Sequence, residues 1–426
     1  MKKTLLFVLL FFSLFPFATA QFPVAAEVQD SFSLDYLRQF AYPLEIRNGK
    51  LAGKGGAVLR ERLGGTQFVA LGEYHGSAAL SRFTKALLPE LKKQGYGYFC
   101  AEIGPNSAPV LEALAGTPSE TQANLKAFYS KYYLPEDEDI PIPFFDGMED
   151  AAFLAEAKAQ GFDLWGMDQE YFTSAIFLSD RLLQLKKEAP NYLEIKMAKV
   201  AFDSTFMDAY RRDVADESGF RMFKTLIESP EVKHYFSFFE KLPAGKAIAD
   251  DLLKSWDIYD RNYYRGGYSH GHRIAHMRNN FLEQYQEAPE ESPKVFIKTG
   301  GFHAAKNYAG SVYDVGNLAY ELSQLNGTGF INIQCTYRYY EQDGKVTDRS
   351  QSAFIPSQGT FQALGRKDQY VLVDLRPILR QMQALELKLP NDVGFHYLKH
   401  LVEGFDFLLI TPLDRAVEAN YDMTTD

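Results

Sequence analysis

The sequence predicts an α/β protein with a mainly parallel sheet flanked by helices and an all-helical insertion that forms a lid. Two observations lead to this prediction. Short apolar runs bounded by glycine alternate with segments of helical spacing, and this alternation is typical of parallel strands joined by crossover helices. Residues 172–290 then show helical spacing throughout, without a clear strand-like run. We expect this segment to cover the sheet.

The first residues carry the pattern of a cleavable export signal. Lys2 and Lys3 precede an apolar run over residues 5–17, and a small-residue cleavage site follows and ends at Ala20. An uncleaved anchor is the alternative, but the run is short for a membrane span. We therefore expect residues 1–20 to be a signal peptide and the mature protein to be periplasmic or secreted, without a stable membrane anchor.

The α/β core is expected in two parts, residues 21–171 and residues 291–426. Residues 28–63 are expected to be a lead-in of helix and loop. Strands are expected at 67–73, 96–103, 162–167, 295–299, 330–337, 371–373 and 407–410, and helices at 77–93, 119–133, 150–160, 318–325 and near 396–402. The helix at 77–93 has apolar residues at helical spacing and ends at Gly95, a typical helix stop.

Composition limits the possible partners of this protein. Hydrophobic residues make up 46% and charged residues 23% of the 426 positions, which is ordinary for a globular protein. The formal net charge is −10, and an acidic surface repels phosphate backbones, so no nucleic-acid partner is expected. The two cysteines, Cys100 and Cys335, are too few for a Cys-rich metal site. They could form a disulfide or remain as buried thiols.

The stretch from Leu71 to Ser77 is the first candidate for chemistry. It reads Leu-Gly-Glu-Tyr-His-Gly-Ser at the end of an apolar run. Glu73 and His75 are two residues apart, so on an extended backbone they face the same way. Ligands of α/β sheets bind beyond the carboxyl ends of the strands, where this pair is expected. The alternative is an ion pair of Glu73 and a helix cap by His75.

Other predicted strands also end in polar residues. These are Glu102, Asp168, Glu170 and His303, the last after Gly300-Gly301-Phe302. A charged side chain at the end of an apolar strand is costly unless it is paired or lies in a solvated cleft. Each of these residues alone could be a structural ion pair. Together they indicate one site, because parallel strands end at the same edge of a sheet.

A third cluster lies between His270 and Asn280. On a helix, Arg273, Met277 and Asn280 fall on one face, and we expect them to bind substrate together with Asp168. A guanidinium suits an anion or carbonyl clamp because it presents a rigid fork of donors. His272 and His276 have metal-chelating spacing but lack the glutamate of the zincin motif. The alternative is a solvated helix face.

Signatures of other enzyme classes are absent from the sequence. It contains no Gly-x-Ser-x-Gly elbow, no Gly-x-Gly-x-x-Gly and no P-loop, so neither an α/β-hydrolase nucleophile nor a nucleotide cofactor is indicated. Ser77 lies near His75 but is weakly supported as a nucleophile. The residues fit histidine and glutamate acting on water, without a cofactor, on a small-molecule substrate.

These motifs together resemble the erythromycin esterase family, which is similar to the ChaN-like haem-binding proteins and the Tiki/TraB proteins. The resemblance rests on Leu71 to Ser77, Glu102, Gly166-Met167-Asp168, Arg273-x3-Met277-x2-Asn280, Gly-Gly-Phe-His303 and the closing run from Phe405 to Ile410. It covers most of the mature chain. The sequence departs from the family at two places: only Tyr74 separates Glu73 from His75, and Gly300 stands where the esterases carry an additional histidine.

The resemblance implies a role for each matching residue. His75 matches the histidine proposed to activate water, and Glu73 and Glu102 match the acids that orient it. His303 matches a second histidine, which would stabilise the oxyanion or protonate the leaving group. Arg273 matches an arginine of the helical lid. The expected reaction is attack of water on an ester or related carbonyl.

Two other functions are compatible with the same residues. In a metal-dependent hydrolase, as the Tiki/TraB-like relatives suggest, Glu73, His75, Glu102 and His303 would bind Zn²⁺ or Mn²⁺. In a ChaN-like binding protein, an aromatic-lined pocket would hold haem or another hydrophobic ligand. The aromatic content of 15% and the tyrosine-rich stretch 259–268 permit such a pocket. Chelator sensitivity and haem absorbance distinguish these two cases.

Overall fold

The structure is a computed structural model that describes residues 32–264, 270–308, 312–351, 356–384, 387 and 395–422. The expected signal peptide at residues 1–20 lies outside these ranges, as does part of the tyrosine-rich stretch 259–268. Within the described ranges, no helix is both long and apolar enough to cross a membrane.

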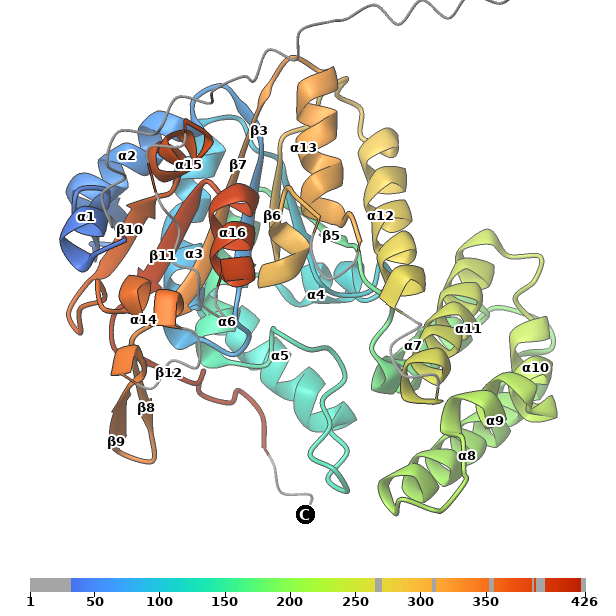
Figure 1. Cartoon of the computed structure of the whole chain (residues 1–426). Coiled ribbons are helices and arrows are strands. Elements are labelled where there is room, and N and C mark those ends of the chain that lie inside the picture. The colour runs from blue at the N-terminus through green and yellow to red at the C-terminus, as the bar shows by residue number, and fades with distance from the viewer. Residues whose placement is uncertain are drawn as a thin grey trace, which may run out of the picture.

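Nine strands of the described chain form one sheet, in the order β2-β1-β10-β11-β7-β3-β6-β4-β5 (Figure 1). They are β1 (Ala41–Arg47), β2 (Lys50–Ala52), β3 (Thr66–Glu73), β4 (Tyr98–Ala101), β5 (Asp163–Gly166), β6 (Val295–Gly300), β7 (Gly329–Tyr337), β10 (Tyr370–Asp374) and β11 (Phe407–Thr411). All neighbours from β11 to β5 are parallel, and the pairs β11/β10, β10/β1 and β1/β2 are antiparallel. The predicted α/β class with a mainly parallel sheet is therefore confirmed.

The lead-in over residues 28–63 differs from the predicted helix and loop. It contains the short helix α1 (Leu34–Arg38), the hairpin of β1 and β2, and helix α2 (Gly53–Leu63). The hairpin turns at Asn48-Gly49, where φ is positive at both residues, 52° and 72°. Asn-Gly favours this two-residue turn because both residues tolerate the left-handed region. The prediction was wrong here because that signal was overlooked.

A second hairpin was overlooked in the same way. Strands β8 (Tyr339–Gln342) and β9 (Lys345–Asp348) turn at Asp343-Gly344, again with positive φ at both residues. With β12 (Asp414–Arg415) they form a small sheet in the order β12-β8-β9. The 3-10 turn η3 (Arg349–Gln351) and helix α14 (Pro356–Gln362) follow.

Helices cover both faces of the large sheet. One face carries α3 (Ala78–Lys93), α4 (Ala108–Leu114), α5 (Pro118–Tyr132) and α6 (Met148–Ala159); the other carries α12 (His270–Glu287), α13 (Val315–Leu325), α15 (Arg376–Gln383) and α16 (Phe395–Gly404). Helix α3 begins where the Ser77 hydroxyl accepts a hydrogen bond from the Leu80 N–H, 3.0 Å away. Gly95 follows it with φ of +85°. The predicted helix at 77–93 is thus confirmed almost to the residue.

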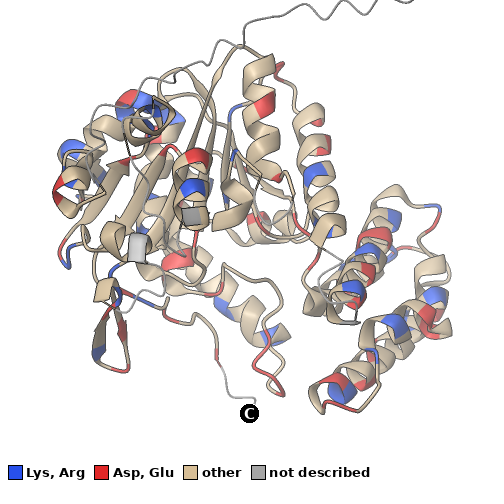
Figure 2. Ribbon diagram, viewed as in Figure 1, with Lys and Arg blue, Asp and Glu red and all other residues tan. Residues whose placement is uncertain are grey.

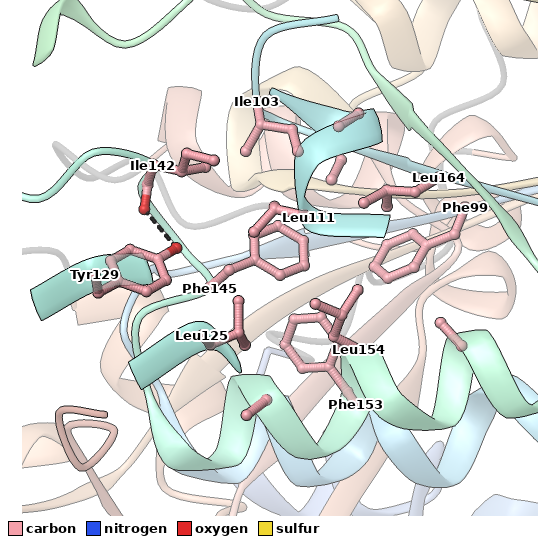
Figure 3. Packing of buried hydrophobic residues seen from close by; sticks show 14 of the residues in the cluster. Phe99, Ile103, Leu111, Leu125, Tyr129, Ile142, Phe145, Phe153, Leu154 and Leu164 are labelled. Atoms are coloured by element: carbon pink, nitrogen blue, oxygen red, sulfur yellow. Dashed lines mark hydrogen bonds between the residues drawn. The ribbon is translucent and has the colours of Figure 1, made fainter. Parts of the chain in front are cut away.

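The packing under the first face is largely aromatic. Figure 3 shows Phe99 of β4 against Phe153 and Leu154 of α6, with Phe145 beside them. Phe99, Phe145 and Phe153 are all 1% exposed or less. Burial of one such side chain contributes roughly 1.5–3 kcal/mol. This core supports the strands whose ends carry the candidate site.

The described residues from 172 to 287 are helical and contain no strand. After the 3-10 turn η1 (Phe172–Ser174) come α7 (Ala175–Leu185), α8 (Tyr192–Val214), α9 (Met222–Glu228), α10 (Pro230–Ser237), α11 (Pro243–Tyr264) and α12. Helices α8 to α11 lie at one end of the sheet, whereas α12 returns along it and contacts α13 and β5 (Figure 1). Acidic and basic residues are mixed on the outlying helices (Figure 2). Movement of this segment as a lid stays a prediction.

The two cysteines lie on opposite faces of the sheet. Cys100 packs in the core under α12 and α13, and Cys335 packs in the core under α3 and α6. Both are buried and free. The sequence allows either a disulfide or two buried thiols, and the structure contains two buried thiols.

Candidate active site

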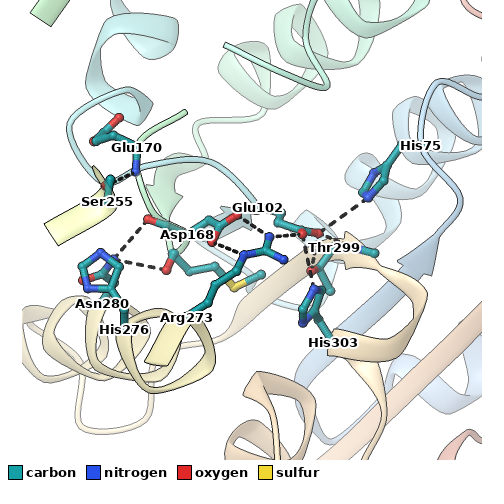
Figure 4. Close-up of polar contacts among 12 residues, drawn as sticks. His75, Glu102, Asp168, Glu170, Ser255, Arg273, His276, Asn280, Thr299 and His303 are labelled. Carbon is teal, nitrogen blue, oxygen red and sulfur yellow. Dashed lines mark hydrogen bonds and ion pairs between the residues drawn. The ribbon is translucent and has the colours of Figure 1, made fainter. Parts of the chain in front are cut away.

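Four neighbouring parallel strands end together at one edge of the sheet. Glu73 is the last residue of β3, Glu102 follows β4, and Asp168 follows β5. Strand β6 ends at Gly300 and continues into the 3-10 turn η2 (Gly301–Ala304), which carries His303. Because the strand order here is β3-β6-β4-β5, these side chains come from adjacent positions. Figure 4 shows the polar contacts around Glu102, Asp168 and His303.

Glu102 lies at the centre of these contacts. One of its oxygens accepts hydrogen bonds from the Gly300 N–H at 2.5 Å and the Thr299 hydroxyl at 2.8 Å. The other accepts from Nη2 of Arg273 at 2.8 Å. Burial alone would raise the pKa of Glu102, but the charges of His303 and Arg273 and the Gly300 N–H lower it to about 2. Glu102 is therefore an ionised carboxylate that is 5% exposed.

Both candidate histidines face this carboxylate. Nε2 of His303 lies 3.4 Å from Oε1 of Glu102, and Nε2 of His75 lies 3.9 Å from Oε2. The opposite ring nitrogen of each histidine has its own acid: Nδ1 of His75 lies 3.2 Å from Glu73, and Nδ1 of His303 lies 2.7 Å from Asp314. An ionised carboxylate only accepts hydrogen bonds, so Nδ1 carries a proton in both rings.

The two imidazoles differ in their surroundings. The His75 side chain is 39% exposed and stacks on Phe144, with ring centroids 4.0 Å apart. The His303 side chain is only 11% exposed. Burial would lower the pKa of His303, but the hydrogen bond to Asp314 and the charge of Glu102 outweigh it and raise that pKa above its usual value. His75 is thus open to solvent, while His303 favours its protonated form.

Arg273 is fixed by two acids. Its Nε donates to Asp168 at 3.0 Å, and its Nη2 donates to both Asp168 and Glu102. Opposite charges raise the pKa of the guanidinium well above its usual value, although burial opposes this. The sequence predicted that Arg273 binds the substrate. In the structure its guanidinium bridges Glu102, which follows β4, and Asp168, which follows β5, and so holds the ends of these two strands together.

Met277 and Asn280 lie behind Arg273. Met277 is fully buried in the core, and Nδ2 of Asn280 donates to the carbonyls of Met167 and Asp168, both at 3.2 Å. His276 is buried next to Asn280, and burial lowers its pKa. These side chains fix the loop after β5.

Ser77 and Glu170 have other partners. The Ser77 hydroxyl donates to Asp414 and caps α3. Glu170 accepts hydrogen bonds from the Asn106 N–H and the Ser107 hydroxyl, and burial raises its pKa to about 7. The structure does not bring either residue into the group around Glu102.

A cavity of about 390 Å³ adjoins Glu102, Asp168 and Arg273. Its other walls are mostly apolar or aromatic and include Ile103, Ile142, Phe144, Tyr171, Ile258 and Tyr259. Phe144 also carries the stacked His75 ring. The cavity lies between the strand ends and α11 of the helical segment.

Gly300 leaves space between the histidines. A Cβ atom at this position would lie 3.1 Å from Nε2 of His75 and 3.3 Å from Oε2 of Glu102. Its φ of −57° is ordinary for any residue, so the backbone does not require glycine. Glycine at this position therefore leaves space beside His75 and Glu102, and its special backbone freedom is not needed.

Two residues of this arrangement were missed in the sequence. Lys298 interrupts the apolar run of β6 and places its Nζ 2.6 Å from Oε2 of Glu73. Asp314 caps α13 and holds His303. The lysine within an apolar strand was a visible signal, whereas nothing local marks Asp314.

The donor set does not fit a divalent metal. Among the described residues, no group of three His, Cys, Asp or Glu side chains is arranged to hold one. Glu73 already binds Lys298, and Glu102 already binds Arg273. A metal ion would have to displace these cations from both carboxylates.

The fold and the site define a class of α/β protein in which two histidines and several acids meet beyond the carboxyl ends of a parallel sheet. No protein-family model and no curated protein matches the sequence. Solved structures do match. A mutant of the erythromycin esterase EreC in its open conformation has a TM-score of 0.54 and 15% identity, over 88% of this chain and 98% of that one.

Two further structures match over similar lengths. A protein from Bacillus cereus has a TM-score of 0.53 and 13% identity, over 91% of this chain and 98% of that one. A succinoglycan biosynthesis protein has a TM-score of 0.52 and 14% identity, over 92% and 99%. At these identities the likeness is one of fold: the chain has the fold of the erythromycin esterase and is a distant structural relative of it.

Proposed function

We propose that the protein is a hydrolase in which His75 activates water for attack on an ester or related carbonyl. The observation that carries the proposal is the shared carboxylate. His75 and His303 each direct Nε2 at Glu102 and hold Nδ1–H on a separate acid. One solvent-exposed imidazole and one enclosed imidazole then face the same carboxylate, an arrangement that suits a general base and a general acid.

The steps follow from the proton positions. Nε2 of His75 takes a proton from water, and the Glu73 carboxylate stabilises the imidazolium that forms. The hydroxide oxygen bonds to the carbonyl carbon, and the carbonyl electrons move to its oxygen. Protonated His303 donates a hydrogen bond to that oxygen. When the carbonyl re-forms and the bond from carbon to the alkoxide oxygen breaks, His303 gives its proton to the leaving alkoxide. The proton on His75 then passes to solvent, and His303 takes up a proton from solvent. General-base assistance of this kind typically accelerates a reaction about 10²–10⁴-fold.

The cavity supports a substrate with an apolar part. Its aromatic and aliphatic walls would bury such a group next to Glu102. Arg273 lines the cavity as well and pairs with both of its acids, Glu102 and Asp168, so these carboxylates do not set the charge of the substrate. The substrate would thus be a small molecule with an apolar portion beside its carbonyl group.

A substrate screen tests the proposal. Purified protein and its His75→Ala variant are assayed against a panel of esters, lactones and peptides, with and without chelator. The expected result is turnover of at least one carbonyl substrate by the parent protein only. Equal rates for the variant, or no hydrolysis across the panel, would count against a His75-dependent hydrolase.

A further inference from the structure

Lys298 is a buried cation beneath the candidate site. It lies on β6, where its register partners are Leu71 of β3 and Ala101 of β4. The residue is 5% exposed, and its Nζ lies 2.6 Å from Oε2 of Glu73, which is 7% exposed. Glu73 uses its other oxygen for Nδ1 of His75. The three side chains therefore form a chain of contacts from the core to the exposed imidazole.

The other groups near Lys298 interact with it at longer range and form no ion pair with it in the described structure. Its Nζ lies 5.2 Å from the centre of the Phe153 ring. Asp150 and the Cys335 thiol also interact with it electrostatically. Asp150 is satisfied by neutral donors, since it accepts hydrogen bonds from the Ser81 hydroxyl and the Gly147 N–H, and burial raises its pKa to about 7. Glu73 is thus the direct ionic partner.

Stability alone is a weak reason for this ion pair. A buried pair loses as much through desolvation as it gains from attraction, and an apolar residue of similar size often replaces it without loss. The site offers a better reason. Burial would raise the pKa of Glu73, but the Lys298 ammonium and His75 lower it. A protonated Glu73 would be a poor acceptor for the imidazole Nδ1–H.

We propose that Lys298 is a positioning residue: its ammonium keeps the Glu73 carboxylate ionised and oriented so that it holds His75 as the base. The inference rests on the proposed function, in which His75 is the base, and it assigns a role that acts through Glu73 and not on the substrate. Each link is a direct contact of a buried or half-buried side chain.

Lys298→Met removes the charge and retains the bulk. We expect kcat to fall about tenfold or more with little change in KM, because cavity contacts are untouched. The acid limb of the pH–rate profile should move to higher pH, because the pKa of Glu73 rises without the ammonium. Lys306→Met is the matched control, because the 2.6 Å ion pair of Lys306 is with Asp406 and not with Glu73 or another acid of the site. Its pH profile should match the parent protein.

A measurement on the free protein tests the role of Lys298 independently of the proposed hydrolase function. The Nδ1–H proton of His75, seen by ¹⁵N-edited NMR, should be present in the parent protein and lost or broadened in Lys298→Met, but retained in Lys306→Met. If the protein shows this NMR result but no hydrolytic activity, the positioning role of Lys298 stands although the proposed hydrolase function fails. An unchanged Nδ1–H signal and pH profile in Lys298→Met would overturn it.

If Lys298→Met alone does not fold, the same substitution can be tested in the Glu73→Gln variant. In Glu73→Gln the buried acid is already neutral, so adding Lys298→Met leaves no unpaired charge. The inference predicts no further loss of kcat when Lys298→Met is added to Glu73→Gln. A further large loss in the double variant would assign Lys298 a role independent of Glu73 and contradict the inference.

Discussion

His75 faces one oxygen of the Glu102 carboxylate and His303 faces the other, at 3.9 and 3.4 Å. The two histidines come from loops after different strands, β3 and β6, which are neighbours in the sheet. Because these two parallel strands are adjacent, histidines that are far apart in the sequence face the same carboxylate. Gly300 keeps that space open because it has no side chain.

His75→Ala should lower turnover strongly and leave the fold intact. We expect a loss of about 10²–10⁴-fold in kcat/KM, the usual share of a general base. The side chain is 39% exposed, so little buried surface is lost. Kinetics and thermal unfolding measure the two effects. His234→Ala, an exposed histidine of α10, serves as the control and should retain full activity.

Gly300→Ala should impair activity without unfolding the protein. The new Cβ would lie 3.1 Å from Nε2 of His75, within the space that water and substrate need. The backbone tolerates alanine because φ is −57°. We expect about tenfold or greater loss of kcat/KM from such displacement. Gly97→Ala is the control, since its Cβ would meet nothing within 4 Å. Full activity in Gly300→Ala would show that the space is not used.

Arg273→Met should destabilise the protein. It leaves the carboxylates of Glu102 and Asp168 without their common cation, and breaking a buried pair costs about 3 kcal/mol or more in free energy of unfolding. Urea unfolding measures the change. Arg278→Met, on the same helix, removes an exposed hydrogen bond to the Tyr313 carbonyl and no ion pair of the described structure, so it should cost much less. Equal stability of the two variants would contradict this structural role.

Stability should fall as pH rises through the raised pKa of His303. Its imidazolium is favoured by Asp314 and Glu102, so the stabilisation is complete below the ordinary pKa of 6.5 and is lost as pH rises through the folded-state pKa. Asp314→Asn removes the first partner and should reduce this dependence. Unfolding free energies at several pH values above and below 6.5 measure it. An Asp314→Asn curve parallel to that of the parent protein would contradict the assignment.

Chelators should leave activity unchanged. Glu73 and Glu102 are already bound to Lys298 and Arg273, and the described residues offer no metal-ligand group of three. Assays after dialysis against a chelator, with metal analysis of the protein, give the result. Loss of activity that Zn²⁺ or Mn²⁺ restores would favour the metal-dependent alternative instead.

The core elements could be predicted from sequence because their signals are local. The spacing of Leu80, Phe83 and Leu87 defines a helix, and apolar runs before Glu73 and Glu102 define strands. Polar residues at several strand ends also indicate a common edge, because parallel strands share it. The hairpin at Asn48-Gly49 was missed although its turn signal is local as well.

The partners of the histidines could not be predicted, because they depend on pairing across the fold. Lys298 reaches Glu73 only because β6 lies next to β3 in the sheet. Asp314 reaches His303 only because α13 begins beside η2. The guanidinium of Arg273 could bind a substrate carbonyl or anion, and only the structure shows that it already pairs with Asp168 and Glu102.

The most direct test of the shared site is a double-mutant cycle on kcat/KM with His75→Ala, His303→Ala and the double variant. If both imidazoles act on one bound substrate, each single variant loses most of the activity and the double variant is scarcely worse than the poorer single. Losses that multiply independently, or a single variant that retains full activity, would contradict a common site at Glu102.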